Sequence, residues 1–146
     1  MDVVIEDLKF NQIDEVYALT KSVFNEAYDL DGIKNLYNKI HEDRKTYRFL
    51  VAILDGKIVG YTSCAMSYNL FDGPCPFMTL WWVCVHPDYR RQKIATKLLD
   101  KAEEIAKENN CDMICFLSED FRLDAHEFYI KNGYNMNSKG FMKFLK

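Results

Sequence analysis

The chain has 146 residues, of which 49% are hydrophobic and 14% aromatic, and this composition predicts one domain with its own core over residues 1–146. A net charge of −3 argues against broad nucleic-acid binding, which usually needs a strongly basic surface. The N-terminus carries early acids, and no segment reaches the roughly 18 apolar residues of a membrane span. We therefore expect a cytoplasmic protein with no nucleic-acid or membrane partner.

Hydrophobic periodicity predicts an α/β chain of the α+β type, with elements in the order β-α-α-β-β-β-α-β-α-β-β. The predicted strands are residues 3–10, two within 47–68, 77–85, 112–118 and a terminal pair around residues 138–140. The predicted helices are residues 12–28, with an apolar stripe that includes Ala27, and residues 31–43, 93–109 and 121–133.

Two features of this order predict the sheet. Asp55-Gly56 suits the tight turn of a β-hairpin, because both central residues need positive φ there. Strand 77–85, apolar almost throughout, forms a βαβ unit with helix 93–109 and strand 112–118, so its two strands should be parallel. We therefore expect a central mixed, mostly antiparallel sheet flanked by helices.

The five cysteines form neither a C-x-x-C pair nor a zinc pattern. We interpret them as reduced thiols in core or half-buried positions, and we expect no metal. They are Cys64, Cys75, Cys84, Cys111 and Cys115.

A basic turn, RRQK at residues 90–93, lies between strand 77–85 and the helix that follows it. A helix N-terminus leaves backbone N–H groups without partners and carries a partial positive charge, and phosphate oxygens suit both features. If the helix begins near Lys93, residues 91–96 supply the amide donors, and the arginines add charge. The first turn has no acid after Asp88, which favours an anion site over the alternative, a solvated charged loop.

The segment VHPDYRRQKIATKLL, residues 85–99, resembles the signature of the GNAT-family N-acetyltransferases. The family pattern is Gln or Arg, two residues, Gly, one residue, then Gly or Ala. Arg90 and Ala95 fit this pattern, and Lys93 stands where glycine is usual. A lysine in a helical conformation is not forbidden there, so we expect altered fit to the ligand and not lost binding.

A second segment, RLDAHEFYIKNGY, is similar to the family's late helix, whose Ala, Tyr and Gly-aromatic positions fall on Ala125, Tyr129 and Gly133-Tyr134. The order of elements matches along nearly the whole chain. Two motifs on the right elements identify the sequence as a member of the GNAT family, which implies the single-domain GNAT fold.

The resemblance implies an enzyme that moves the acetyl group of acetyl-CoA to a primary amine of a small molecule or protein, by direct attack in a ternary complex. The pyrophosphate would lie on the helix start, and the pantetheine arm would run beside strand 77–85, where neighbouring strands splay. Arg122 stands where many relatives carry a coenzyme-contacting Asn. The alternative, that the Arg122 side chain is simply exposed to solvent, is equally favoured. The implied coenzyme-binding residues are Val83, Cys84, Val85, Arg90, Arg91, Gln92, Lys93, Ile94, Ala95, Thr96 and Arg122.

The resemblance makes Tyr129 the general acid, because the matching family tyrosine points its hydroxyl at the coenzyme sulfur. Without the motif, a helix tyrosine buried by its ring would be the better interpretation. The general base is open. Many relatives carry Glu where this chain has Leu117, and Glu119, just beyond that position, is the candidate base, with Asp120 beside it. Water is an alternative base, and His126 is better explained as a structural or surface residue.

The partners expected from the resemblance are acetyl-CoA and an amine acceptor. Glu26, Asp29 and Asp31 lie between the first two helices, a region that shapes the acceptor pocket in the family, and they favour a cationic acceptor. The oligomeric state, a homodimer included, stays open. The alternatives are a non-catalytic acetyl-CoA-binding sensor or interaction module, and an anion-binding domain for another phosphorylated ligand.

Overall fold

Five strands form one sheet in the order β1-β2-β3-β4-β5. Neighbouring strands are antiparallel except β4 and β5, which are parallel as the βαβ unit predicted. The strands are β1 Val4–Asp7, β2 Tyr47–Leu54, β3 Lys57–Ser67, β4 Phe77–Val85 and β5 Ile114–Cys115. The helices are α1 Ile13–Phe24, α2 Leu30–Ile40, α3 Ile94–Glu108 and α4 Leu123–Lys131, with 3-10 turns η1 Phe10–Gln12, η2 Leu70–Asp72 and η3 Pro87–Tyr89.

The computed structural model describes residues 2–26 and 28–146, and these divide into two compact units. The first unit, Met1–Cys115, contains the sheet with α1, α2 and α3, and the second, Phe116–Lys146, contains α4. The α+β fold with a mixed, mostly antiparallel sheet is confirmed. The expectation of one domain over residues 1–146 stays a prediction.

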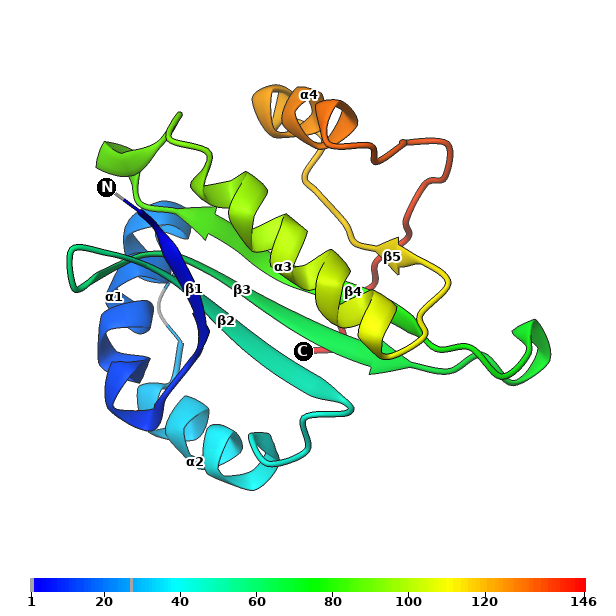
Figure 1. Ribbon diagram of the computed structural model, residues 1–146, viewed down its shortest axis with the longest axis horizontal. Helices are drawn as coiled ribbons and strands as arrows, with labels where there is room; N and C mark the ends of the chain where they lie inside the picture. The colour runs from blue at the N-terminus through cyan, green and yellow to red at the C-terminus, as the bar shows by residue number, and fades with distance from the viewer. Residues whose placement is uncertain (1, 27) are drawn as a thin grey trace. The chain divides into compact units, whose positions relative to one another are not determined.

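Helices α1 and α3 cover opposite faces of the sheet (Figure 1). Val51 of β2 packs in one cluster with Val16 and Leu19 of α1. Its neighbour Ala52 points to the other face, because side chains alternate along a strand. The two sides of β2 therefore belong to two different apolar layers, and both residues are fully buried.

The layer under α3 depends on a glycine in β3. A Cβ at Gly60 would lie 3.1 Å from the side chains of Ile94 and Leu98 and 3.2 Å from that of Ala52. The absence of a side chain lets α3 lie close to the sheet at the helix N-terminal end. The buried stripe of α3 that rests on this face consists of Ile94, Leu98, Leu99, Ala102, Ile105 and Ala106.

The hairpin predicted at Asp55-Gly56 is confirmed. It joins β2 to β3, and both residues have positive φ, 50° at Asp55 and 77° at Gly56. Both central residues of a type I′ turn are left-handed, and the twist of that turn matches the twist of the two strands.

Several elements are shorter than the periodicity indicated. Helix α1 ends at Phe24 because Asn25 takes the left-handed conformation and closes the last turn on Lys21 O. Ala27, which the predicted stripe included, lies outside the described residues. Strand β5 has only the two residues that pair with β4, so an apolar segment is not by itself a strand.

The predicted terminal strand pair around residues 138–140 is wrong. Residues 134–146 form no strand, and several of their apolar side chains are almost fully exposed, among them Phe141, Phe144 and Leu145. A strand needs a neighbour for its backbone N–H and C=O groups, and the described residues of the second unit contain no strand that could serve as one.

Candidate active site

The turn from β4 into α3 is built on two left-handed residues, Arg91 with φ of 63° and Lys93 with φ of 61°. Lys93 is the N-cap residue of α3, and the helix begins at Ile94. The expectation of a helical Lys93 is therefore wrong, because Lys93 is left-handed and the helical conformation begins one residue later. A left-handed residue also explains the glycine of the family pattern, since positive φ carries little cost without a Cβ.

The start of α3 presents backbone donors. Its first intrahelical hydrogen bond runs from Lys97 N to Lys93 O, at 3.0 Å. The N–H groups of Ile94, Ala95 and Thr96 precede that bond and therefore point out of the helix end. The first turn has no acid, and the side chains of residues 90–93 are exposed. This end of α3 thus combines amide donors, the positive end of the helix dipole and three cations.

Strand β4 carries a bulge just before this turn. Tyr61 of β3 pairs with Cys84 and Ser63 pairs with Trp81, so Thr62 alone faces two residues of β4, Trp82 and Val83. Trp82 has a φ of 64°, in the left-handed region. Thr62 is fully buried and donates its hydroxyl to Trp81 O at 3.3 Å. A bulge of this kind leaves main-chain groups out of the ladder and redirects side chains.

The far side of β4 is only briefly paired. Its ladder with β5 has two pairs, Met78 with Ile114 and Thr79 with Cys115. Beyond Thr79, no described residue continues the ladder with β5, so residues 80–85 have no strand partner on that side. The predicted coenzyme-binding residues 83–85 lie on this open length, directly after the bulge.

The bulge turns the Trp82 side chain towards the end of α1, where it meets two other rings. The Trp82 centroid lies 4.8 Å from that of Phe24 and 5.1 Å from that of Tyr28, both in T-shaped geometry. Tyr17 donates its hydroxyl to Tyr28 O at 2.9 Å, and the Tyr28 hydroxyl donates to the Glu26 carboxylate. The loop between α1 and α2 is thereby held against β4, and an acid is held beside the rings.

The other two predicted acids of this loop belong to the start of α2. Asp29 is its N-cap residue and Asp31 lies in its first turn. Acids at a helix N-terminus are stabilised by the helix dipole, so these two have a structural explanation. Glu26 is the acid of the three that contacts the aromatic cluster.

Tyr129, the predicted acid, lies in the second unit among other rings. Its centroid is 4.6 Å from that of Phe116 and 6.2 Å from that of Tyr134. Phe128, its neighbour in α4, lies 5.4 Å away. These edge-to-face contacts fix the direction of the Tyr129 ring, which a positioned proton donor requires.

The remaining predicted residues of the second unit surround the start of α4. Arg122 is the N-cap residue, and its guanidinium lies over the Phe121 ring, 5.6 Å from the centroid. His126 Nε2 lies 2.9 Å from Glu119 O, and a carbonyl can only accept, so this ring nitrogen carries a proton. His126 therefore makes a hydrogen bond within the second unit, and its structural role stays a prediction. The side chains of Glu119 and Asp120 are exposed.

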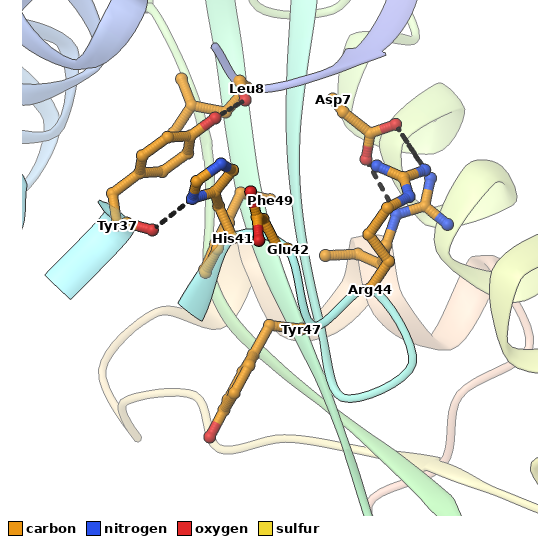
Figure 2. Close-up of a pocket in the computed structure, with 9 residues that line it drawn as sticks. Asp7, Leu8, Tyr37, His41, Glu42, Arg44, Tyr47 and Phe49 are labelled. Carbon is orange, nitrogen blue, oxygen red and sulfur yellow. Dashed lines mark hydrogen bonds and ion pairs between the residues drawn. The ribbon is translucent and has the colours of Figure 1, made fainter. Parts of the chain in front are cut away.

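Sequence reasoning missed a charged hollow of about 280 Å³ at the other end of β1 and β2. Arg48 donates to both Asp7 oxygens, at 2.8 and 3.0 Å, and Arg44 donates to one of them at 3.1 Å. Figure 2 shows the Tyr37 hydroxyl at the Leu8 carbonyl and Arg44 beside Asp7. Burial raises the pKa of Asp7, but the two arginines outweigh it, so the net pKa lies below the ordinary value.

No local signal could have found this cluster, because its members are far apart in the sequence. The bulge at Trp82 also could not be predicted from the sequence, because an apolar run has the same pattern with or without a bulge. Among residues 2–26 and 28–146, no group of three or more His, Cys, Asp and Glu side chains could hold a metal ion. No helix in those residues is long and apolar enough to cross a membrane.

Comparison with known proteins defines the class. The sequence model of the acetyltransferase (GNAT) family matches residues 13–134. The aminoalkylphosphonate N-acetyltransferase of Salmonella typhimurium (strain LT2) is 28% identical over 132 residues, which are 90% of this chain and 84% of that protein. The protein is therefore an acyltransferase.

Solved structures agree with this class at the level of the fold. A transcriptional regulator from Bacillus halodurans C-125 superposes with a TM-score of 0.88 at 23% identity, covering 99% of this chain and 100% of the other. The Trypanosoma brucei acetyltransferase Tb11.01.2886 gives 0.83 at 20% identity, with the same coverage. The chain belongs to the acetyltransferase (GNAT) family, and the predicted GNAT fold is confirmed.

Proposed function

We propose that the protein transfers the acetyl group of acetyl-CoA to a primary amine, by direct attack of the amine on the thioester. One observation carries the proposal. Strand β4 has a bulge and lacks a strand partner on one side of its last residues, and it leads directly into the start of α3, where backbone amides without helical partners lie beside three cations. The helix start suits a pyrophosphate, and the open length of β4 suits the amide groups of a pantetheine arm. These two adjacent features match the two chemically different parts of one ligand.

The coenzyme-binding residues proposed are those of the turn, the helix start and the open strand. Residues 91–96 supply amides for the pyrophosphate, and Arg90, Arg91 and Lys93 supply charge. Residues 83–85 supply main-chain groups for the pantetheine arm. A main-chain N–H at the bulge stabilises the oxyanion that forms on the thioester carbonyl. Arg122 is proposed as a further coenzyme contact.

A cysteine-linked acyl intermediate is disfavoured at β4. Burial raises the pKa of the Cys84 thiol to about 12, and its side chain is 2% exposed. A thiol is nucleophilic as its thiolate, so Cys84 stays inactive near neutral pH. This supports direct transfer in a ternary complex, with acetyl-CoA and the amine bound together.

In the proposed reaction, the amine nitrogen bonds to the thioester carbonyl carbon and the carbon–sulfur bond then breaks. Tyr129 gives its hydroxyl proton to the departing thiolate. The amine must be neutral to attack, although a free alkyl amine has a pKa near ~10. Glu119 or a water molecule takes the proton that the attacking nitrogen loses.

The acceptor side is proposed to be the wall formed by Trp82, Phe24 and Tyr28 with Glu26. Rings and a carboxylate favour a cationic amine, through cation–π and charge attraction. The relative from Salmonella typhimurium is named for aminoalkylphosphonates, which makes an aminoalkylphosphonate the second acceptor class to test.

The proposal is tested by acetyl-CoA-dependent thiol release with an amine panel, with the acetylated product identified by mass. The panel contains an arylalkylamine, a polyamine and an aminoalkylphosphonate. Tyr129→Phe should lower kcat by roughly 100-fold and leave the acetyl-CoA Kd unchanged, and Phe128→Leu is the control for disturbed packing in α4. Thermal shifts with acetyl-CoA, CoA and ATP accompany the assay. Absence of stabilisation by either coenzyme form would refute the proposal.

A further inference from the structure

Cys75 and Cys111 lie on the two chain segments that enter the parallel strands β4 and β5. Cys75 lies between η2 and β4, and Cys111 between α3 and β5. Met78 pairs with Ile114 in the parallel ladder. Each cysteine stands three residues before its member of that pair, so both lie on the chain segments that lead into the start of the ladder.

The two segments stay joined as far as the cysteines. Met78 N donates to Met113 O at 2.9 Å, and Asp112 N donates to Pro76 O at 3.1 Å. The second bond links the residues that directly follow the two cysteines. Hydrogen-bonded neighbouring chains run about 4.8 Å apart, and a disulfide forms between Cα atoms about 4.4 to 6.8 Å apart.

The two thiols are also close enough to interact electrostatically. Burial, the Asp112 charge and the Cys75 thiol together raise the pKa of Cys111. Both cysteines therefore stand beside the hydrogen bond that joins Asp112 to Pro76.

Accessibility separates this pair from the buried cysteines. Cys75 and Cys111 are half-buried, whereas Cys64 and Cys84 are 1% and 2% exposed. Burial also raises the pKa of Cys64 to about 12. A dissolved oxidant can therefore reach the first two thiols and not the second two. All five cysteines are free thiols in the structure, so the pair is present in its reduced form.

We propose that Cys75 and Cys111 are a thiol-oxidation site that forms a reversible intramolecular disulfide with a low-molecular-weight disulfide such as oxidised glutathione. One cysteine thiolate attacks a glutathione sulfur, forms a mixed disulfide and releases one glutathione thiolate. The other cysteine thiolate attacks the protein sulfur of the mixed disulfide and releases the second. The two protons lost by the cysteines go to the two glutathione thiolates, and the two electrons reduce the glutathione disulfide.

The bond would tie the end of the β3–β4 connection to the α3–β5 connection. It would close the chain from Cys75 to Cys111, which contains β4 and α3, into a loop. A closed loop of this length restricts the unfolded chain, and the melting temperature should rise by about 10 °C. Because burial contributes to the raised pKa of Cys111, oxidation should be faster at pH 9 than at pH 7.

The test incubates the full chain with oxidised glutathione, blocks the remaining thiols with N-ethylmaleimide and maps peptides without reduction. We expect a protein lighter by two hydrogen atoms, one cross-linked peptide pair that contains Cys75 and Cys111, and a melting temperature that dithiothreitol returns to its starting value. The peptide map of the unaltered chain does not depend on how any variant folds.

Variants assign the bond. Cys75→Ser and Cys111→Ser should each accumulate a single glutathione adduct and gain no thermal stability, whereas the control Cys115→Ser should still form the disulfide. Stable glutathione adducts on the unaltered chain without a cross-link would overturn the proposal. So would a cross-link that involves Cys115, or no reaction of either cysteine.

Discussion

Replacing Lys93 with glycine should stabilise the fold, which is unusual for a substitution at a helix start. Lys93 has a φ of 61° at the N-cap of α3, and a left-handed conformation costs a residue with a Cβ about 1–2 kcal/mol. Glycine avoids that cost, but its extra freedom in the unfolded chain returns about 0.5–1 kcal/mol. The net gain is about 0.5–1 kcal/mol, or a rise of about 2–4 °C in melting temperature.

Lys93→Ala is the matched control, because alanine keeps the Cβ and removes the charge. Both variants should be measured by urea unfolding at equal protein concentration, with the free energy of unfolding compared at constant m. We expect Lys93→Ala to be as stable as the unaltered chain and Lys93→Gly to exceed both. If the glycine variant is no more stable than the alanine variant, the left-handed strain at Lys93 is not real.

The same two variants measure what the lysine charge does for the coenzyme. An exposed charge contact contributes about 0.2–1 kcal/mol, so removal of the charge should raise the acetyl-CoA Kd by about 1.4- to fivefold. Both variants should show this rise by calorimetry, because both lack the ammonium group. Unchanged affinity in both would mean that the Lys93 side chain leans away from the phosphates.

Three other substitutions test separate parts of the structure. Asp7→Asn should lower the free energy of unfolding by about 1–2 kcal/mol at pH 7. The folded pKa of Asp7 is depressed. The stabilisation by the Asp7 carboxylate is therefore present above about pH 4 and is lost as pH falls through the folded pKa. If urea titrations give the same difference in unfolding free energy between Asp7→Asn and the unaltered chain at pH 7 and at pH 2.5, this prediction is contradicted. Gly60→Ala places a Cβ 3.1 Å from two side chains of α3 and should lower the free energy of unfolding by about 1–3 kcal/mol through overpacking. Gly56→Ala has open space around its Cβ, so it tests the turn conformation alone. Trp82→Ala should raise the acceptor KM, measured by initial rates, more than the acetyl-CoA Kd, measured by calorimetry. A larger effect on the acetyl-CoA Kd would mean that Trp82 does not contact the acceptor.

The elements that could be predicted are those whose signal is local. The Asp55-Gly56 turn is determined by two adjacent residues, and strand 77–85 by one apolar run, and both are confirmed with these bounds. The basic turn was found because charge and helix start are adjacent in the chain. These features depend on near neighbours, which a sequence displays directly.

The features that were missed depend on residues brought together by the sheet. The bulge at Trp82 arises from a register shift against Thr62, and no property of residues 77–85 marks it. The Asp7–Arg48 ion pair joins β1 to β2 across a long stretch of chain. The terminal strands were predicted from apolar residues such as Phe141, whose side chain is 97% exposed, because hydrophobicity alone does not supply a pairing partner.

The central claim is that the start of α3 and the open length of β4 bind acetyl-CoA. A titration of the isotope-labelled chain with acetyl-CoA, followed by backbone amide chemical shifts, tests it most directly. The largest shifts should fall on residues 91–96 and 83–85, with residues around Asp7 and Arg44 unchanged. No shift at the α3 start, or larger shifts at the Asp7 hollow, would contradict the claim.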